Sequence, residues 1–206
     1  MARNRNDTRV VLSRIYTRTG DGGMTRLGDM SEVAKTDPRL AAYADVDEAN
    51  CAIGAAVAMG QFDPGIAAAL TRVQNELFDV GADLCKPITH RGSDSAETGG
   101  TSGDLRITEE YIVGLEAECD RFNEELEVLR SFVLPGGTPG AALLHTARAV
   151  TRRAERSTWA VLGTLGDSVN PLTARYLNRL SDLLFILARR ANSERGDVLW
   201  KPGGQR

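Results

Sequence analysis

Four dipeptides that pair a helix-capping residue with proline constrain the fold of this 206-residue chain more than any other feature. They are Asp37-Pro38, Asp63-Pro64, Thr138-Pro139 and Asn170-Pro171. The side chains of Asp, Thr and Asn accept hydrogen bonds from the free backbone N–H groups of a first helical turn. Proline fits the next position because the N–H that it lacks would have no partner there. Each dipeptide therefore predicts the start of a helix.

A fifth start is predicted at Thr108, because the charges of Glu109 and Glu110 suit a helix N-terminus. The helices are then predicted at residues 38–59, 64–84, 108–130, 139–163 and 171–193. Only 5% of the residues are aromatic, and no alternating strand pattern of useful length occurs. The sequence thus predicts an all-α fold, a five-helix antiparallel bundle.

The bundle is expected to be a single domain over residues 15–193, flanked by a flexible tail at 1–14 and a C-terminal tail at 194–206. The polar, glycine- and serine-rich connection after the second helix is expected to be mobile. A net charge of −3 provides no general attraction to nucleic acid or to an acidic membrane. No apolar run approaches the roughly 20 residues of a membrane span. Three cysteines without a CxxC pair are typical of reduced thiols, and a cytoplasmic location is expected.

Residues 16–29, YTRTGDGGMTRLGD, concentrate glycine and threonine ahead of the first helix. Glycine lets a ligand approach the backbone amides closely, and hydroxyls with successive N–H groups can cradle a polyphosphate. A tight surface turn explains the same composition. The segment is neither a Walker A loop nor a dinucleotide-binding fingerprint.

The predicted fourth helix, AALLHTARAVTRRAERSTWAVLG, separates apolar from charged residues. Its predicted core stripe contains Leu143, Ala147, Val150, Ala154 and Val161. The opposite face carries Arg148, Arg152, Glu155 and Arg156, with His145 beside them. This face could simply be solvated. However, like charges at i, i+4 and i+8 repel one another, and a bound polyanion would remove that conflict.

Two other helices carry weaker signals. In the fifth, Asn178, Ser181 and Asp182 form a short polar ridge. In the first, Asp47 and Glu48 are either surface charges or carboxylates that orient an arginine through a charge-assisted contact.

Together these stretches resemble the PduO-type ATP:cob(I)alamin adenosyltransferases. The resemblance is carried by YTRTGDGGMTRLGD, KTDPRLAAYADVDEAN, QNELFDVGADL, FVLPGGTPGAALLHTARAVTRRAER and NPLTARYLNRLSDLLFILAR, over about residues 15–192. It implies a homotrimer of five-helix bundles with a glycine-rich N-terminal arm. It also implies that this trimer binds ATP and cobalamin between neighbouring subunits. The implied reaction transfers the 5′-deoxyadenosyl group of ATP to cob(I)alamin and releases triphosphate.

The resemblance also implies residue roles at the ATP site. Positions in the arm that wraps ATP are Thr17, Arg18, Thr19, Gly20, Thr25 and Arg26. Lys35 matches a lysine that contacts the nucleotide, and Asn178 matches an asparagine at the ATP–magnesium site. A further segment at this site is Arg152, Arg153, Ala154, Glu155 and Arg156. In the family, its first arginine binds the phosphates and its glutamate lies near the nucleoside. One departure is TRTG at residues 17–20, where many members carry TKTG.

Two further roles follow from the resemblance. Arg148 matches an arginine that pairs with an acid of the adjacent subunit, here Asp47, and Phe132 matches a phenylalanine under the corrin ring. Without the resemblance, Phe132 would be assigned to the core.

The implied chemistry needs no protein nucleophile or general base, because Co(I) itself attacks the 5′ carbon of ATP. The protein must align the reactants and stabilise the leaving group, with Mg²⁺ on the ATP.

No protein side chains are identified as a metal-ligand set. A ferritin-like di-iron bundle is excluded, because neither His90 nor His145 has a Glu three residues before it. A delivery protein that carries adenosylcobalamin with little turnover remains an alternative. A reductase and an adenosylcobalamin-dependent client enzyme are possible partners.

Overall fold

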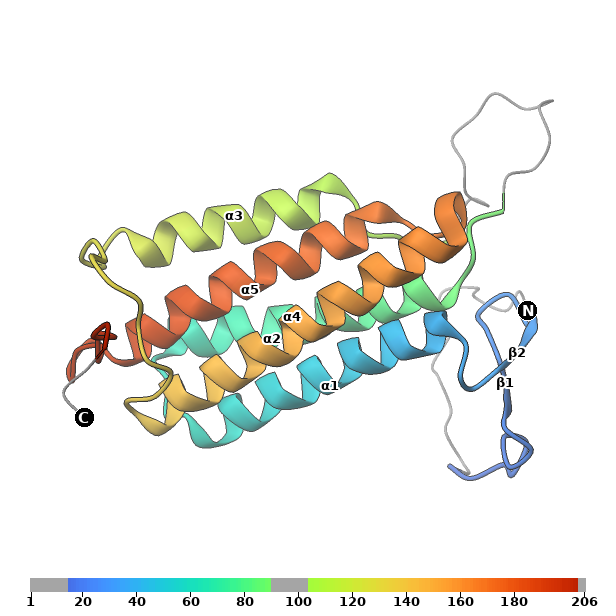
Figure 1. Ribbon diagram of the computed structural model, residues 1–206, viewed down its shortest axis with the longest axis horizontal. Helices are drawn as coiled ribbons and strands as arrows, with labels where there is room; N and C mark the ends of the chain where they lie inside the picture. The colour runs from blue at the N-terminus through green and yellow to red at the C-terminus, as the bar shows by residue number, and fades with distance from the viewer. Residues whose placement is uncertain (1–14, 90–103, 204–206) are drawn as a thin grey trace, which may run out of the picture.

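The computed structural model describes residues 15–89 and 104–203. The expected flexible tail at 1–14, most of the expected mobile loop and residues 204–206 lie outside the described residues. The helices are α1 (Pro38–Met59), α2 (Pro64–Cys85), α3 (Glu109–Asn123), α4 (Pro139–Leu165) and α5 (Pro171–Ala191), with a 3₁₀ turn at Gly166–Ser168. They run up and down along one axis, so the five-helix all-α prediction is confirmed (Figure 1).

The helix starts follow the local sequence signals. Asp37, Asp63, Thr138 and Asn170 each accept a hydrogen bond from a backbone N–H of the first turn, at 2.8–3.2 Å. Thr108 precedes α3 as predicted, although its side chain makes no capping hydrogen bond to the backbone. All five predicted starts are therefore confirmed.

The predicted end of the third helix at residue 130 is wrong, because α3 ends at Asn123. Its buried apolar residues stop at Phe122, and Val128 is 86% exposed, so further helical turns would bury little. Glu124 and Glu125 also place negative charge at the helix C-terminus, which the helix dipole disfavours.

Helix α4 lies across the middle of the bundle between α1 and α5 (Figure 1). Helix α2 packs on α1, and α3 packs on the outer side of α5. The inward face of α4 differs from the predicted stripe, since Leu143 and Val150 are only half-buried. The residues buried on it are Gly140, Ala141, Leu144, His145, Ala147, Thr151, Ala154, Thr158 and Val161.

Two threonines occupy this core face without unpaired hydroxyls. Thr151 and Thr158 donate to the carbonyl oxygens of Ala147 and Ala154, each at 2.9 Å. This bond to the preceding turn satisfies a hydroxyl that burial would otherwise leave without a partner.

A small hairpin precedes the bundle, formed by β1 (Met24–Arg26) and β2 (Glu32–Ala34) in antiparallel register. Three-residue strands are too short for alternation to reveal them, which explains their absence from the prediction. Gly28 fastens the hairpin to the end of α2, because its N–H donates to the carbonyl of Cys85 at 3.0 Å. The hairpin lies at one end of the bundle, and residues 124–138 and the chain after α5 lie at the other (Figure 1). Within the described residues, no helix is long and apolar enough to cross a membrane.

Candidate functional site

The N-terminal segment before α1 presents hydroxyls and an irregular backbone. The side-chain oxygens of Thr17 and Thr19 are 2.9 Å apart. Arg18 between them has a φ of 63°, in the left-handed region that non-glycine residues rarely adopt. Its guanidinium lies 5.8 Å from the ring centre of Tyr16, and all four side chains are exposed.

Lys35 lies against the glycine-rich turn. A Cβ at Gly20 would lie 2.8 Å from the Lys35 Nζ, so only glycine permits this approach without displacing the ammonium group. The Lys35 N–H donates to the carbonyl of Gly23 at 2.8 Å, and Gly23 has a φ of 80°. Thr25 and Arg26, in β1, are half-buried and exposed respectively. The predicted arm residues thus form one local unit with Lys35.

The arginines of α4 divide into two groups. Arg152 and Arg156 are exposed, and among the described residues no ion pair or hydrogen bond of their side chains is found. Arg148 is half-buried, and burial together with the charge of Arg152 lowers its pKa. Of the repulsion expected along this face, the structure thus bears on the pair Arg148 and Arg152.

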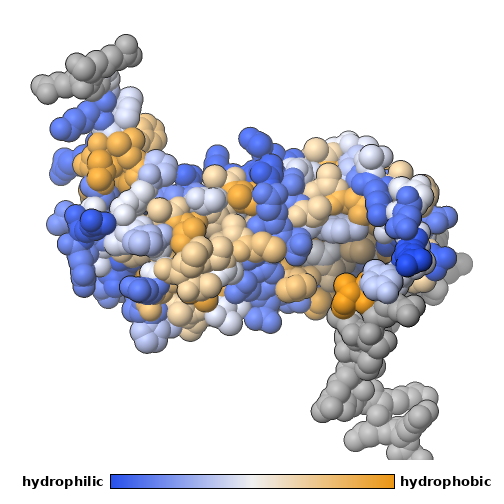
Figure 2. All heavy atoms as spheres, turned by 90° about the horizontal axis from the view of Figure 1, so that it is seen from below, coloured by the Kyte–Doolittle hydropathy of each residue, from blue (hydrophilic) through white to orange (hydrophobic). Residues whose placement is uncertain are grey.

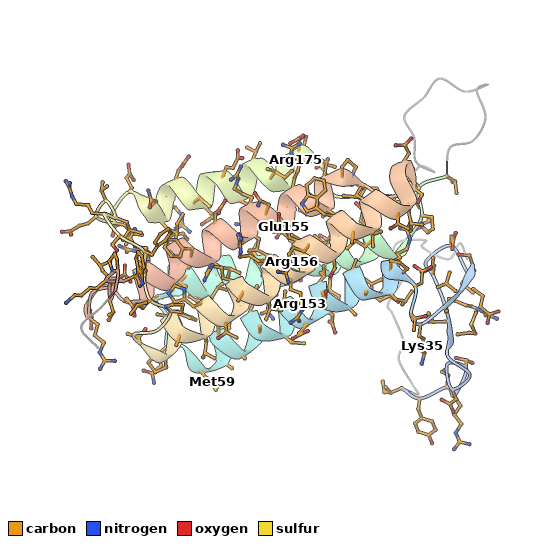
Figure 3. All side chains as sticks on the ribbon, in the orientation of Figure 1. Lys35, Met59, Arg153, Glu155, Arg156 and Arg175 are labelled. Carbon is orange, nitrogen blue, oxygen red and sulfur yellow. The ribbon has the colours of Figure 1, made fainter. Side chains whose placement is uncertain are left out.

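Arg153 points elsewhere, toward α1. Its Nε lies 3.3 Å from an oxygen of Asp45, and its Nη2 contacts Glu48 (Figure 3). One of the two predicted acids of the first helix therefore orients an arginine, as one alternative proposed. The next residue, Ala154, is fully buried in the core.

Glu155 and Asn178, predicted from different helices, meet on the surface. The Asn178 amide donates to the Glu155 Oε1 at 3.1 Å, and the Trp159 Nε1 donates to the same oxygen at 3.3 Å. This contact places one carboxylate and one amide beside the exposed Arg152 and Arg156 on α4.

Two residues expected on polar faces are buried instead. His145 is 3% exposed, its ring stands edge-on to Phe185 with centroids 6.0 Å apart, and burial and Arg148 lower its pKa. Ser181 is 2% exposed. His145 is buried because the core face of α4 is rotated relative to the predicted stripe, and Ser181 belongs to the buried face of α5.

A cleft of about 790 Å³ lies between the segment before α4, the chain after α5 and the helices α4 and α5. Phe132 is 76% exposed there, so its alternative assignment to the core is wrong. Its ring stands at 65° to that of Trp200, with centroids 6.0 Å apart. The cleft is lined by Leu129, Arg130, Ser131, Phe132, Val133, Arg148, Phe185, Trp200 and Pro202.

Sequence reasoning missed Trp200 and Phe185 as cleft residues. Trp200 reaches the cleft because the chain after α5 pairs with the segment before α4, through an antiparallel bridge between Val133 and Leu199. The three consecutive apolar residues Val198, Leu199 and Trp200 are a weak signal for a strand, and no local pattern indicates the segment with which it pairs.

Asp47 lines a second cleft of about 480 Å³, between α1 and α2, together with Tyr43 and Phe78. Arg148 lines the first cleft, so the two residues predicted to pair are not brought together within one chain. The same holds for the predicted ATP residues: Lys35 lies at one end of the molecule, whereas Glu155 and Arg156 lie midway along it (Figure 3). Within residues 15–89 and 104–203, no three His, Cys, Asp or Glu residues gather into a metal-binding group.

Comparison with known proteins gives a consistent family. The family model of cobalamin adenosyltransferase matches residues 15–191. The corrinoid adenosyltransferase of Mycobacterium tuberculosis is 58% identical over 197 residues, covering 96% of this chain and 97% of the relative. The corrinoid adenosyltransferase of Bacillus subtilis is 39% identical over 187 residues, covering 89% of each.

Solved structures agree in fold. A phenylalanine-to-alanine variant of the PduO-type ATP:corrinoid adenosyltransferase of Lactobacillus reuteri, complexed with cobalamin and ATP, has a TM-score of 0.76 and 34% identity. The match covers 91% of this chain and 99% of that one. An arginine-to-lysine variant of the same enzyme, complexed with ATP, has a TM-score of 0.75. The helical bundle, the sequence motifs and these relatives together show that the chain belongs to the cobalamin adenosyltransferase family, among its PduO-type corrinoid adenosyltransferases.

Proposed function

We propose that the chain works as a homotrimer whose ATP and corrinoid sites each combine residues of two neighbouring copies. The chain is an ATP:corrinoid adenosyltransferase, which transfers the 5′-deoxyadenosyl group of ATP to a reduced corrinoid and releases triphosphate. The proposal concerns where that reaction takes place and which residues perform it.

The separation of the candidate residues along the bundle carries this proposal. The arm with Lys35 and the α4 face with Arg156 lie apart in one chain (Figure 3). One ATP molecule contacts both only if a second copy supplies one of them. Helix α1 exposes alanines on its outer side, and apolar side chains gather on the face seen from below (Figure 2).

At the ATP site, the arm would hold the phosphates through its hydroxyls, its backbone N–H groups and Lys35. Arg152 of the neighbouring copy would add a bidentate contact, which suits the planar guanidinium. Glu155 and Asn178, already joined at 3.1 Å, would border the nucleoside and the Mg²⁺. Mg²⁺ keeps several waters and binds mainly through phosphate oxygens, so a site without three clustered protein ligands fits it.

At the corrinoid site, Phe132 and Trp200 would offer an apolar surface to the lower face of the ring. The Co(I) centre forms a bond to the 5′ carbon with its own electron pair, and the C–O bond to triphosphate breaks. The triphosphate takes that bond's electrons, so the cations around it stabilise the developing charge. The protein otherwise aligns the cobalt, carbon and leaving oxygen, and no proton transfer by a side chain is needed.

Mixed trimers test the shared ATP site. We expect Lys35→Ala and Arg152→Ala to be nearly inactive alone, because each removes a cation from every site. When the two variants are unfolded together and refolded as an equal mixture, about a quarter of the sites would combine an intact arm with an intact Arg152. Turnover with ATP and chemically reduced cobalamin should recover to about that fraction.

Absence of any recovered turnover would contradict the shared site. If both cations act within one chain, no mixed assembly contains an intact site and turnover stays at the level of the single variants. Sedimentation of the mixture, which shows whether trimers reform, serves as its control.

A charge exchange tests the proposed contact between Asp47 and the neighbouring Arg148. Asp47→Arg and Arg148→Asp should each weaken the assembly and turnover, whereas the double variant should regain part of both. Residues in contact show coupling energies of about 0.5–3 kcal/mol. Subunit dissociation measured by sedimentation supplies the energies, and strictly additive losses would mean that the two side chains never meet.

The alternative function, delivery of adenosylcobalamin to a client enzyme with little turnover, uses the same corrinoid site. Multiple turnovers per subunit in the assay above would exclude delivery as the main role.

The three cysteines are free thiols, which supports the cytoplasmic location expected for a partner of a reductase and a client enzyme.

A further inference from the structure

A polar cluster lies where α5 ends, made of the buried Arg189 and Asn192 and the half-buried Asp197. We call it the α5 clasp. Arg189 is 8% exposed and Asn192 is 2% exposed. The Nε of Arg189 lies 2.9 Å from the Oδ2 of Asp197, and its Nη2 donates to the carbonyl of Glu127 at 2.8 Å. Buried charges of this kind are stable only when they are paired and hydrogen-bonded.

Asn192 extends the clasp to the loop before α4. Its amide donates to the carbonyl of Gly136 at 3.0 Å and to the Oδ1 of Asp197 at 3.3 Å. Its Oδ1 accepts from the Thr138 N–H at 2.9 Å. A Cβ at Gly137, where φ is 103°, would lie 2.2 Å from that oxygen, so glycine is required there. The clasp thus joins the loop before α4, the end of α5 and the chain that follows.

The chain held by the clasp carries one wall of the cleft. Immediately after Asp197, Val198 accepts a backbone hydrogen bond from Leu134 at 2.8 Å. The Trp200 N–H donates to the carbonyl of Phe132 at 2.7 Å, and the Ser131 hydroxyl donates to the Trp200 carbonyl at 2.7 Å. These bonds place the Trp200 ring edge-on to that of Phe132.

The cleft wall has little packing of its own. Val198, Leu199 and Trp200 are 60%, 42% and 44% exposed, so burial contributes little to their position. A short strand pair with little buried surface is marginal without further support. The nearest paired side chain in the chain is that of Asp197, which is half-buried and accepts hydrogen bonds from both Arg189 and Asn192.

We propose that Asp197 is a positioning residue for corrinoid binding: through Arg189 and Asn192 it fixes the chain that holds Trp200 against Phe132. Asp197 is absent from the lining of the cleft and acts only through that chain. The proposal rests on the corrinoid role proposed for the cleft.

The variant Asp197→Asn tests it, because asparagine keeps the size and removes the charge that pairs with Arg189. In the trimer as purified, amide hydrogen exchange over residues 198–200 should accelerate about tenfold or more, without any corrinoid present. The KM for cobalamin should rise about tenfold, whereas the KM for ATP stays within about twofold. Asp197→Glu, which retains the charge, should recover part of both effects.

Glu125→Gln is the matched control. It removes a carboxylate from the adjacent arginine, Arg190, whose Nη1 lies 2.6 Å from the Glu125 Oε2. This pair lies at the surface, since the Glu125 side chain is 70% exposed, and surface pairs contribute little. Exchange and both KM values should match those of the unmodified chain.

The outcomes separate the possibilities. Faster exchange with an unchanged cobalamin KM overturns the positioning role, and unchanged exchange overturns the clasp itself. Equal rises in both KM values indicate a general structural effect and also overturn the positioning role.

If Asp197→Asn fails to fold, Ser131→Ala removes one hydrogen bond to Trp200. This variant should then raise both the rate of exchange and the cobalamin KM. If Trp200→Ala leaves the cobalamin KM unchanged while Asp197→Asn accelerates exchange, the corrinoid role of the cleft is wrong and the clasp stands.

Discussion

Replacing Arg152 with alanine is expected to lower kcat by about 10²–10³-fold, the usual cost of removing one preorganised donor to a developing negative charge. The side chain is exposed on α4, so it serves no packing role that its loss would disturb. Burial and the charge of Arg152 both lower the pKa of Arg148, so a bound anion is expected to be favourable beside these two residues. Steady-state turnover with ATP and chemically reduced cobalamin measures the effect, and circular dichroism should show an unchanged helical content.

A second exposed arginine distinguishes a specific contact from a loss of positive charge. Arg175 lies on α5 and pairs with Glu109 of α3 at the surface (Figure 3). Arg175→Ala should leave turnover within about twofold, since exposed pairs contribute little. Near-normal turnover of Arg152→Ala at saturating ATP, or an equal loss in both variants, would remove Arg152 from the phosphate site.

Replacing Phe132 with alanine is expected to abolish most turnover when the enzyme must start from cob(II)alamin, with little loss of stability. The ring is 76% exposed, so the roughly 3–5 kcal/mol that a core phenylalanine would cost is not expected. What is lost is the edge-on contact with Trp200, which contributes about 0.5–1.5 kcal/mol. An apolar ring under the corrin would displace the lower axial ligand, and four-coordinate Co(II) is easier to reduce than five-coordinate Co(II).

Two measurements separate these contributions for Phe132→Ala. The EPR spectrum of bound cob(II)alamin should show the five-coordinate form, and the affinity for ATP should hardly change. Chemically prepared cob(I)alamin bypasses the reduction and should restore a large part of the rate. A variant that still forms four-coordinate Co(II), or that melts far below the unmodified chain, would exclude the proposed role.

The helix starts could be predicted from the sequence because each depends on neighbours within one turn. Asp37, Asp63, Thr138 and Asn170 bond to backbone groups two or three residues away. The end of α3 could not be predicted in this way, because it depends on the length over which α3 can bury apolar side chains against α5. The fold class thus followed from local signals, whereas one boundary depended on packing.

The candidate site was predictable only in part, for a related reason. The exposed arginines of α4 follow from helical periodicity, whereas the contact between Glu155 and Asn178 joins two helices and was not predicted. The burial of His145 could not be predicted in this way. Thr151 and Thr158 enter the core with their hydroxyls bonded to the preceding turn, and this rotates the buried face of α4 toward His145. Trp200 was missed since its place depends on pairing with residues far away in the chain, which no local pattern encodes.

The placement of the hairpin and the Phe132 cleft at opposite ends of one bundle has a consequence for how the enzyme behaves on dilution (Figure 1). If each site borrows residues from a neighbour, a folded single chain is chemically silent. Activity per chain then depends on protein concentration through mass action, and falls more steeply than the amount of folded protein once the copies separate. In that case, reactive Co(I) would be generated only where a completed assembly can capture it, and the level of expression would set a threshold for the reaction.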